Sequence, residues 1–316
     1  MFNEQQNLAI VRTELDSVFY QEFNYQDSNP VMTTCQNGMI FRQETTDRAF
    51  DIEEVYRGTN LYPIISETQT VPTSTPKVAN KITTQIKDFA ESVELSKNLF
   101  DDNLHGVWAE TVRDLAENAR ISMDANAFKI FRGAFTTSLT ADGVSLVGNH
   151  ALLNGAFYSN NLYTISSAST VLSSTSLNAA IVALAVQPNQ NGIVKGQQPQ
   201  VLLVPPALIK LALELSDSAL AGDVSTNAIN VYRSAYGYRV FSNPYLSAAT
   251  GGSDTAWFLL ARNTGIKRII RQGIETFLRP WGYSNNRTYL YQANFREEVV
   301  AIDYVGVIGA VGSATS

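Results

Sequence analysis

Residues 104–135 read LHGVWAETVRDLAENARISMDANAFKIFRGAF, and this stretch predicts the longest helix of the chain. Apolar side chains recur in it at steps of three or four residues, which is the spacing of one face of an α-helix. The recurring residues are Trp108, Val112, Leu115, Ala119, Met123, Ala127, Ile130 and Ala134, and Ile121, Phe128, Phe131 and Phe135 widen the stripe. Asp101 and Asp102 favour a helix N-terminus through capping and the helix dipole. At 1.5 Å per residue the helix would measure about 48 Å, so we expect it to act as a spine.

Downstream of this helix, the pattern predicts two turns and then a compact α/β unit over residues 165–262. The turns are 142–146 and 149–155. The continuous apolar run at 200–204 is typical of a strand that is buried on both faces. Pro205 and Pro206 end this strand and start the next helix. The predicted elements of the unit are a helix carrying Leu177, Ile181, Leu184 and Val186, a turn over 188–196, a buried strand over 200–204, a helix over 207–215, a mobile surface loop over 219–230, and strands over 238–241 and 256–261.

The C-terminal segment alternates aromatic and polar residues in a way that predicts a strand. Tyr289, Tyr291, Ala293 and Phe295 would share one face, and we expect that face to cover the spine helix. Residues 299–311 form a second strand-like run.

Upstream of the spine, the sequence predicts a helical arm followed by a long hairpin. Leu8, Val11, Leu15, Val18, Phe19 and Phe23 recur at helical spacing, and the helix is expected to end near residues 26–30. Two extended runs, 49–62 and 78–95, then flank a polar tip at 65–77 that contains two prolines. An isolated two-stranded ribbon is marginally stable in water, so we expect its partner surface to be another subunit.

The composition excludes several classes of protein. The charged fraction is 16%, lower than in most soluble domains, which indicates either a surface that faces copies of itself or simple drift in composition. The net charge of −6 argues against a protein that grips nucleic acid. Cys35 is the single cysteine, so it has no partner for an internal disulfide. With neither a signal peptide nor a membrane-spanning run, we expect a soluble intracellular product.

No catalytic, cofactor-binding or metal-binding motif is present, and we predict that the protein is not an enzyme and has no cofactor. The two histidines are His105, in the first turn of the spine, and His150. His150 could act as a base with Asp142, but we favour a hydrogen bond that stabilises the turn.

The other charged residues are also predicted to be structural. Glu53-Glu54 and Glu297-Glu298 would point to opposite faces of their strands and be solvated. Arg262, Lys267, Arg268, Arg271 and Arg279 could contact phosphate, but we favour ion pairs with carboxylates of a neighbouring subunit.

Taken in order, the helical arm, the hairpin, the spine, the Asp142-Gly143 turn with His150 after it, and Leu202-Leu203-Val204-Pro205-Pro206 before a helix resemble the major capsid proteins of tailed bacteriophages. These proteins share the Hong Kong 97 fold with encapsulins and the herpesvirus capsid floor. The resemblance covers nearly the whole chain. The Asp142 to His150 segment together with Ala256-Trp257-Phe258-Leu259 is most similar to the heads of Mu-type phages.

The resemblance implies an α+β, Hong Kong 97-like subunit divided into five parts. These are an N-terminal arm (1–45), an extended loop (46–90), a peripheral domain (91–164) whose spine helix spans 104–135, an axial domain (165–262) and closing strands of the peripheral domain (263–316). It also implies pentamers and hexamers that tile an icosahedral shell around double-stranded DNA, with a portal and with scaffolding or decoration proteins as partners. The product would be a virion component assembled in the bacterial cytoplasm, without sequence-specific DNA binding and without a membrane.

Some relatives crosslink a hairpin lysine to an asparagine of a neighbour. Lys77 and Lys81 are the candidate donors here, and we favour ordinary surface lysines because no acceptor is identifiable. Two other functions stay open: an encapsulin-type compartment, which would need a groove for a cargo peptide, and, more distantly, a soluble hydrolase built from scattered Asp, Ser and Tyr residues.

Overall fold

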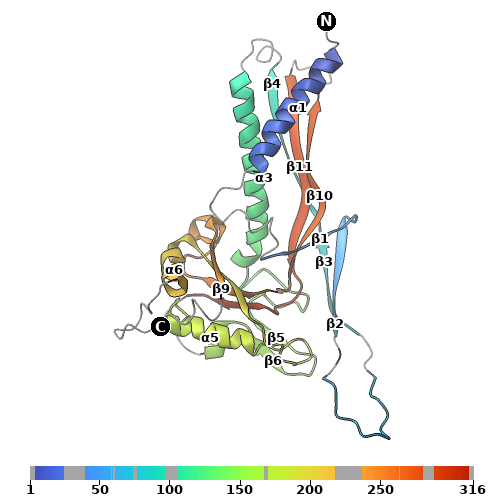
Figure 1. The fold of residues 1–316 in the computed structure, drawn as a ribbon, viewed down its shortest axis with the longest axis vertical. Helices are drawn as coiled ribbons and strands as arrows, with labels where there is room; N and C mark the ends of the chain where they lie inside the picture. The colour runs from blue at the N-terminus through green and yellow to red at the C-terminus, as the bar shows by residue number, and fades with distance from the viewer. Residues whose placement is uncertain are drawn as a thin grey trace.

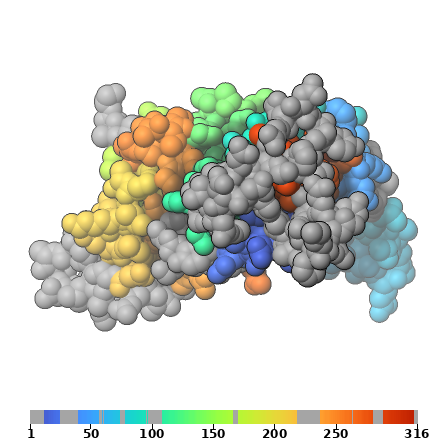
Figure 2. Space-filling view, turned by 90° about the horizontal axis from the view of Figure 1, so that it is seen from above, coloured from blue at the N-terminus to red at the C-terminus, as the bar shows by residue number. Residues whose placement is uncertain are grey.

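The computed structural model describes residues 4–24, 40–57, 59, 61–73, 77–96, 105–166, 170–217, 237–262, 264–279 and 288–312. The molecule is elongated (Figure 1): a long helix and a long sheet run side by side, with a compact α/β unit at one end and a hairpin that projects beside that unit. Viewed along the long axis, the α/β unit and the hairpin lie on opposite sides of the molecule (Figure 2). Within the described residues, no helix combines the length and apolarity needed to cross a membrane.

Both long predicted helices are confirmed. The helices are α1 (Glu4–Phe23), α3 (His105–Arg132), α4 (Leu162–Ser166), α5 (Ser174–Ala185) and α6 (Ile209–Asp217), with short 3-10 turns η1 (Pro206–Leu208), η2 (Pro244–Leu246) and η3 (Ala248–Thr250). Helix α3 ends at Gly133, whose carbonyl accepts hydrogen bonds from the N–H groups of Thr136, Thr137 and Ser138. A side chain at Gly133 would collide with Thr137, so glycine permits this tight stop. Asp101 and Asp102 lie outside the described residues.

The long sheet has the strand order β1-β10-β11-β4. Its strands are β1 (Arg42–Thr45), β4 (Lys87–Ser96), β10 (Ile266–Arg279) and β11 (Thr288–Ala301). The predicted alternation in β11 is confirmed, because Tyr289, Tyr291, Ala293 and Phe295 are all buried. Helices α1 and α3 cover this face through a cluster that contains Leu15, Phe19, Trp108, Val112 and Leu115.

Two features of this sheet differ from the prediction. Residues 299–311 do not form one strand: β11 ends at Ala301, the chain turns at Gly306, where φ is +86°, and β12 (Val307–Ala310) joins the other sheet. The 14-residue strand β10 lies within the closing strands that the resemblance implies (263–316), but the residue pattern did not identify it as a separate strand. Its pairing with β11 shifts register at two irregularities between Ile270 and Glu275, which interrupt the alternation that would have identified it.

The predicted hairpin is present but shorter than expected. Strand β2 (Phe50–Arg57) pairs with β3 (Lys77–Gln85) in an antiparallel two-stranded sheet. The expected second run, 78–95, is divided at Ile86, after which β4 pairs with β11 instead. Ile86 is buried against Ile269, Val300 and Ile302, so this side chain turns the strand into the body of the subunit.

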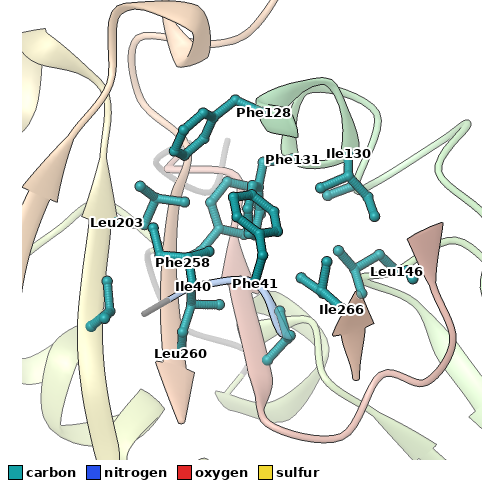
Figure 3. Close-up of a cluster of buried hydrophobic side chains, with 14 of the residues drawn as sticks. Ile40, Phe41, Phe128, Ile130, Phe131, Leu146, Leu203, Phe258, Leu260 and Ile266 are labelled. Atoms are coloured by element: carbon teal, nitrogen blue, oxygen red, sulfur yellow. The ribbon is translucent and has the colours of Figure 1, made fainter. Parts of the chain in front are cut away.

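The α/β unit is built on a second four-stranded sheet with the order β12-β9-β7-β8. The strands are β7 (Pro199–Val204), β8 (Arg239–Ser242), β9 (Trp257–Ala261) and β12, while β5 (Asn149–Ala151) and β6 (Phe157–Ser159) form a separate pair. One face packs on the end of α3 through Phe131, Leu203 and Phe258 (Figure 3), and the other packs on α4, α5 and α6. The predicted strands are confirmed, and the loop at 219–230 lies outside the described residues. The boundary at 262 stays a prediction, although β12 lies beyond it.

A buried ion pair joins β10 to β11. The Arg268 guanidinium donates to Glu297 through Nε at 2.9 Å, and both side chains are almost fully buried. Burial raises the pKa of Glu297, and the charge of Arg268 only partly offsets that effect. Glu298, on the opposite face, pairs with Lys87. The prediction that Glu297 and Glu298 are solvated is therefore wrong, because each faces a cation of its own chain.

Replacing Arg268 with Met should lower the free energy of unfolding of the unassembled subunit by about 3 kcal/mol, because Glu297 would lose the cation that compensates its burial. The double variant R268M/E297M should recover at least half of that loss. Urea denaturation followed by circular dichroism measures both. As a control, Arg12→Met removes a half-exposed partner of Asp16 and should cost less than about 1 kcal/mol. An R268M subunit as stable as the wild type would contradict the assignment.

Candidate assembly surface

The hairpin exposes large apolar side chains that nothing in the described part of its own chain covers. Phe50, Ile52 and Tyr56 on β2 are each more than half exposed. Beyond the strands, Tyr62 and Ile64 are 98% and 100% exposed. Such a concentration of apolar surface on a two-stranded ribbon is typical of a protein contact. The hairpin is therefore the first candidate surface for assembly.

An ion cluster fixes the base of this hairpin to the long sheet. Lys267 on β10 donates through Nζ to Glu44 on β1 and to Glu53 on β2, both at 2.8 Å. Lys267 and Glu53 are largely buried. Glu53 was predicted to be solvated, which is wrong, whereas Glu54 points outward as expected and is exposed. The cluster ties β10 to β1 and β2, which lie more than 200 residues earlier in the chain, and we call it the hairpin lock.

The pKa shifts of Glu44 and Lys267 favour the charged form of each group at neutral pH. Burial acts to raise the pKa of Glu44, but the hydrogen bond and charge of Lys267 outweigh it and leave that pKa lowered. Burial acts to lower the pKa of Lys267, but Glu44 and Glu53 outweigh it and leave that pKa raised. The contribution of Glu44 is thus present above its unfolded pKa and lost as pH falls through its folded pKa. The contribution of Lys267 is lost only in strong base.

The basic cluster predicted from the sequence does not form one patch. Lys267 and Arg268 are neighbours on β10 but use opposite faces of the sheet, each toward a carboxylate of the same chain. The prediction that they pair with a neighbouring subunit is therefore wrong for these two. Arg262 and Arg279 are exposed, and the guanidinium of Arg279 lies 5.9 Å from the centre of the Phe277 ring.

His150 and Asp142 form a buried structural pair. His150 Nδ1 lies 2.7 Å from Asp142 Oδ2, and Asp142 Oδ1 accepts from Thr140 Oγ1 and from the backbone N–H of Val144. The ring of Tyr304 stacks on His150 at a centroid distance of 4.2 Å. His150 is fully buried, and Nε2 has no hydrogen-bond partner among the described residues. This contact confirms the predicted hydrogen bond of His150. The imidazole is not exposed to solvent.

Burial acts to raise the pKa of Asp142, but the hydrogen bonds from His150 and Thr140 outweigh this effect and lower it. His105 is the first residue of α3, and its side chain lies outside the described parts, as does that of Lys77. Lys81 is exposed on β3, as predicted for an ordinary surface lysine.

One hollow of the described structure lies beside the spine helix α3. It has a volume of about 310 Å³, lies between α3, β4 and β11, and is lined by Phe89, Leu115 and Phe295, with Asp88 and Glu91 also in its lining. Across the described residues, no three His, Cys, Asp or Glu side chains are grouped as metal ligands would be. The feature that favours contacts between proteins is the exposed apolar surface of the hairpin.

Comparisons with known proteins agree with this interpretation. A family described as phage capsid protein matches residues 79–310. The capsid of a native GTA particle is 14% identical with a TM-score of 0.55, covering 92% of this chain and 93% of that one. The capsid of Myoviridae phage XM1 is 11% identical with a TM-score of 0.52, covering 92% and 94%. A virus-like particle from Pyrococcus furiosus is 8% identical with a TM-score of 0.50, covering 94% and 98%. No curated protein matches significantly in sequence.

Replacing Lys267 with Met should loosen the hairpin without unfolding the subunit, because Glu44 and Glu53 would face each other without a cation. Amide hydrogen exchange should become about tenfold faster in β2 and β3 and stay unchanged in α3 and β11. Lys81→Met, on the exposed side of the same hairpin, is the matched control and should leave exchange unaltered. Equal protection of the hairpin in K267M and wild type would show that the lock does not hold it.

Replacing Asp142 with Asn should lower the free energy of unfolding at pH 7 by about 1–3 kcal/mol, because a charge-assisted bond to His150 is lost. Since the pKa of Asp142 is lowered, its contribution is complete above the unfolded pKa of about 3.9 and disappears below it. The difference between variant and wild type, measured by urea denaturation, should therefore shrink as the pH falls below about 4. A difference that grows with acid would contradict the assignment.

Proposed function

We propose, because this chain belongs to the phage capsid protein family, that it is the major subunit of an icosahedral shell and that its hairpin carries the contacts closing that shell. Its fold is the α+β capsid fold of the Hong Kong 97 type. As a capsid protein it self-assembles and is a component of the virion. The observation that carries the proposal for the hairpin is the exposure of Phe50, Ile52, Tyr56, Tyr62 and Ile64 on a ribbon without a cover.

The projecting hairpin determines the type of contact between subunits. The exposed hairpin differs from the surface it would meet, so each contact is heterologous and leads to a closed ring when the rotation between subunits closes. Rings of five and six, the pentamers and hexamers of a shell, follow from small changes in one contact. The hairpin lock supports this role because it fixes the direction of β2 and β3 against the sheet. Many modest contacts formed together would stabilise the shell through avidity.

The remaining partners follow from charge and family. We propose that the shell encloses double-stranded DNA without sequence-specific binding, which agrees with a net charge of −6 and with two of five clustered cations paired internally. A portal, and scaffolding or decoration proteins, are proposed as further partners, and assembly is proposed to take place in the cytoplasm of the bacterial host. Placement near the Mu-type heads stays a prediction, as do the five domain boundaries.

The alternatives have less support. The similarity to the Pyrococcus particle shows a shared fold, whereas the matching family is that of phage capsids, so a compartment of the encapsulin type is not favoured. We also propose a structural rather than an enzymatic role. The histidine and aspartate that offered the best catalytic pair, His150 and Asp142, are bound to each other, and the histidine is fully buried.

Electron microscopy and sedimentation of the purified chain test the proposal. The wild type should give closed shells or rings of five and six subunits. Replacing residues 61–73 with a short Gly/Ser linker should leave the subunit folded but prevent shell closure, because this segment is exposed throughout its length.

A sharper variant keeps the length of the hairpin and changes only its apolar tip. Substitution of Leu61, Tyr62 and Ile64 by Ser should raise the concentration needed for assembly by about tenfold, since three exposed anchors are removed. Thermal unfolding of the subunit should not change. A wild type that stays monomeric at every salt concentration would contradict the shell, and a collapse of subunit stability would place the tip in the subunit's own core.

A further inference from the structure

A second surface stands out by its lack of charge. From Gly143 to Val194 the sequence contains no Asp, Glu, Lys or Arg, although the chain as a whole is 16% charged. Asp142 and Lys195 bound this segment. Its histidine, His150, is fully buried. Loss of charge over such a length is not required by burial, because much of the segment is on the surface.

This uncharged segment folds into β5, β6, α4 and α5, which cover one side of the α/β unit along the lower edge in Figure 1. Its inward residues, among them Leu162, Leu177, Ile181 and Leu184, fill the core against β7, β9 and β12. The elements contact each other: α4 touches both α5 and β6, and the hydroxyl of Tyr158 donates to the carbonyl of Ala183 on α5. These contacts hold β6, α4 and α5 together as one unit.

The outward side of this unit is apolar. Of the exposed large apolar residues in the described chain, nine lie on the hairpin between residues 50 and 78, eight lie in the uncharged segment, and five lie elsewhere. We define the uncharged face by six of the eight: Phe157, Tyr163, Ile165, Val171, Val182 and Val186. Val182 and Val186 are both more than half exposed and lie one turn apart at the end of α5. Phe157 is 69% exposed.

The backbone N–H groups at the start of α5 are also capped by neutral side chains. The N-terminus of α5 is closed by a capping box in which Ser173 accepts from the N–H of Ser176, and Ser176 accepts from the N–H of Ser173. The third position of such a box is commonly Glu or Gln. A serine there satisfies the same backbone donor without placing a charge beside Val171. The surface is therefore free of charge at its caps as well as along its helices.

Charge depletion with exposed aromatic and aliphatic residues is the composition of the centre of a protein interface. We infer that the uncharged face packs against a second copy of this chain within the shell, as a contact separate from the hairpin. The inference rests on the proposed shell. A partner must itself be uncharged there, because a charge brought against this face would lose its hydration without gaining a counter-ion. Another subunit meets that requirement, and contact through an uncharged segment keeps the repulsion between subunits of net charge −6 away from the interface.

The test places a charge on the uncharged face. Val182→Glu and Val182→Lys should each raise the critical concentration for assembly by about tenfold or more, because every closed contact would bury an unpaired charge. Thermal unfolding of the subunit should be unchanged, since Val182 is 54% exposed. The matched control is Leu213→Glu, a similarly exposed aliphatic residue on α6 of the same unit that lies beside Lys210 and Glu214. It should assemble like the wild type.

The outcomes separate this inference from the shell itself. If the wild type forms shells and V182E and V182K form them equally well, the inference is overturned while the proposed function stands. If V182E is defective but V182K is not, general repulsion between acidic subunits explains the result and the inference fails. If L213E were as defective in assembly as V182E, the effect would not be specific to the uncharged face and the inference would fail. Failure of the wild type to assemble at all would count against the proposed function first.

Discussion

The packing of α3 and α1 against the long β11 strand is the constraint on which the rest of the structure depends. Trp108, Val112 and Leu115 from α3 form one cluster with Tyr289 and Tyr291 from β11, so the helix and the strand run side by side (Figure 1). At its other end α3 delivers Phe128 and Phe131 to the sheet of the α/β unit. One rod thereby connects two cores, and the hairpin and the uncharged face are held at defined positions relative to each other.

Two neighbouring cations of β10 form ion pairs within the subunit. Lys267 joins β1, β2 and β10, and Arg268, next to it in sequence, joins β10 to Glu297 on the other face of the sheet. The exposed large apolar residues are concentrated elsewhere, on the hairpin and on the uncharged face. This division has a physical basis: internal ion pairs fix geometry at neutral pH, whereas contacts with low charge allow copies of an acidic protein to approach.

Patterns with a clear period predicted their elements well. The three-to-four spacing around Trp108 to Ala134 predicted α3, the alternation around Tyr289 to Phe295 predicted β11, and the apolar run before Pro205 predicted β7. A turn-stabilising hydrogen bond of His150 was also predicted, and the structure identifies Asp142 as its partner. Strand β10 could not be identified from its pattern, since its irregular register hides the alternation, and the chain's break at Ile86 depends on Ile269, Val300 and Ile302, which are far away in sequence.

The sequence by itself determined the class of fold, the order of the arm, hairpin, spine and α/β unit, and the absence of any recognisable catalytic motif, because these depend on local periodicity and on residue types. Only the tertiary structure decided which charges pair, where the hairpin ends, and which apolar residues of the uncharged segment are exposed. The physical reason is that ion pairing, strand partnership and exposure are properties of residues brought together in space, and nothing in the local sequence around Lys267 specifies Glu44 and Glu53 as its partners.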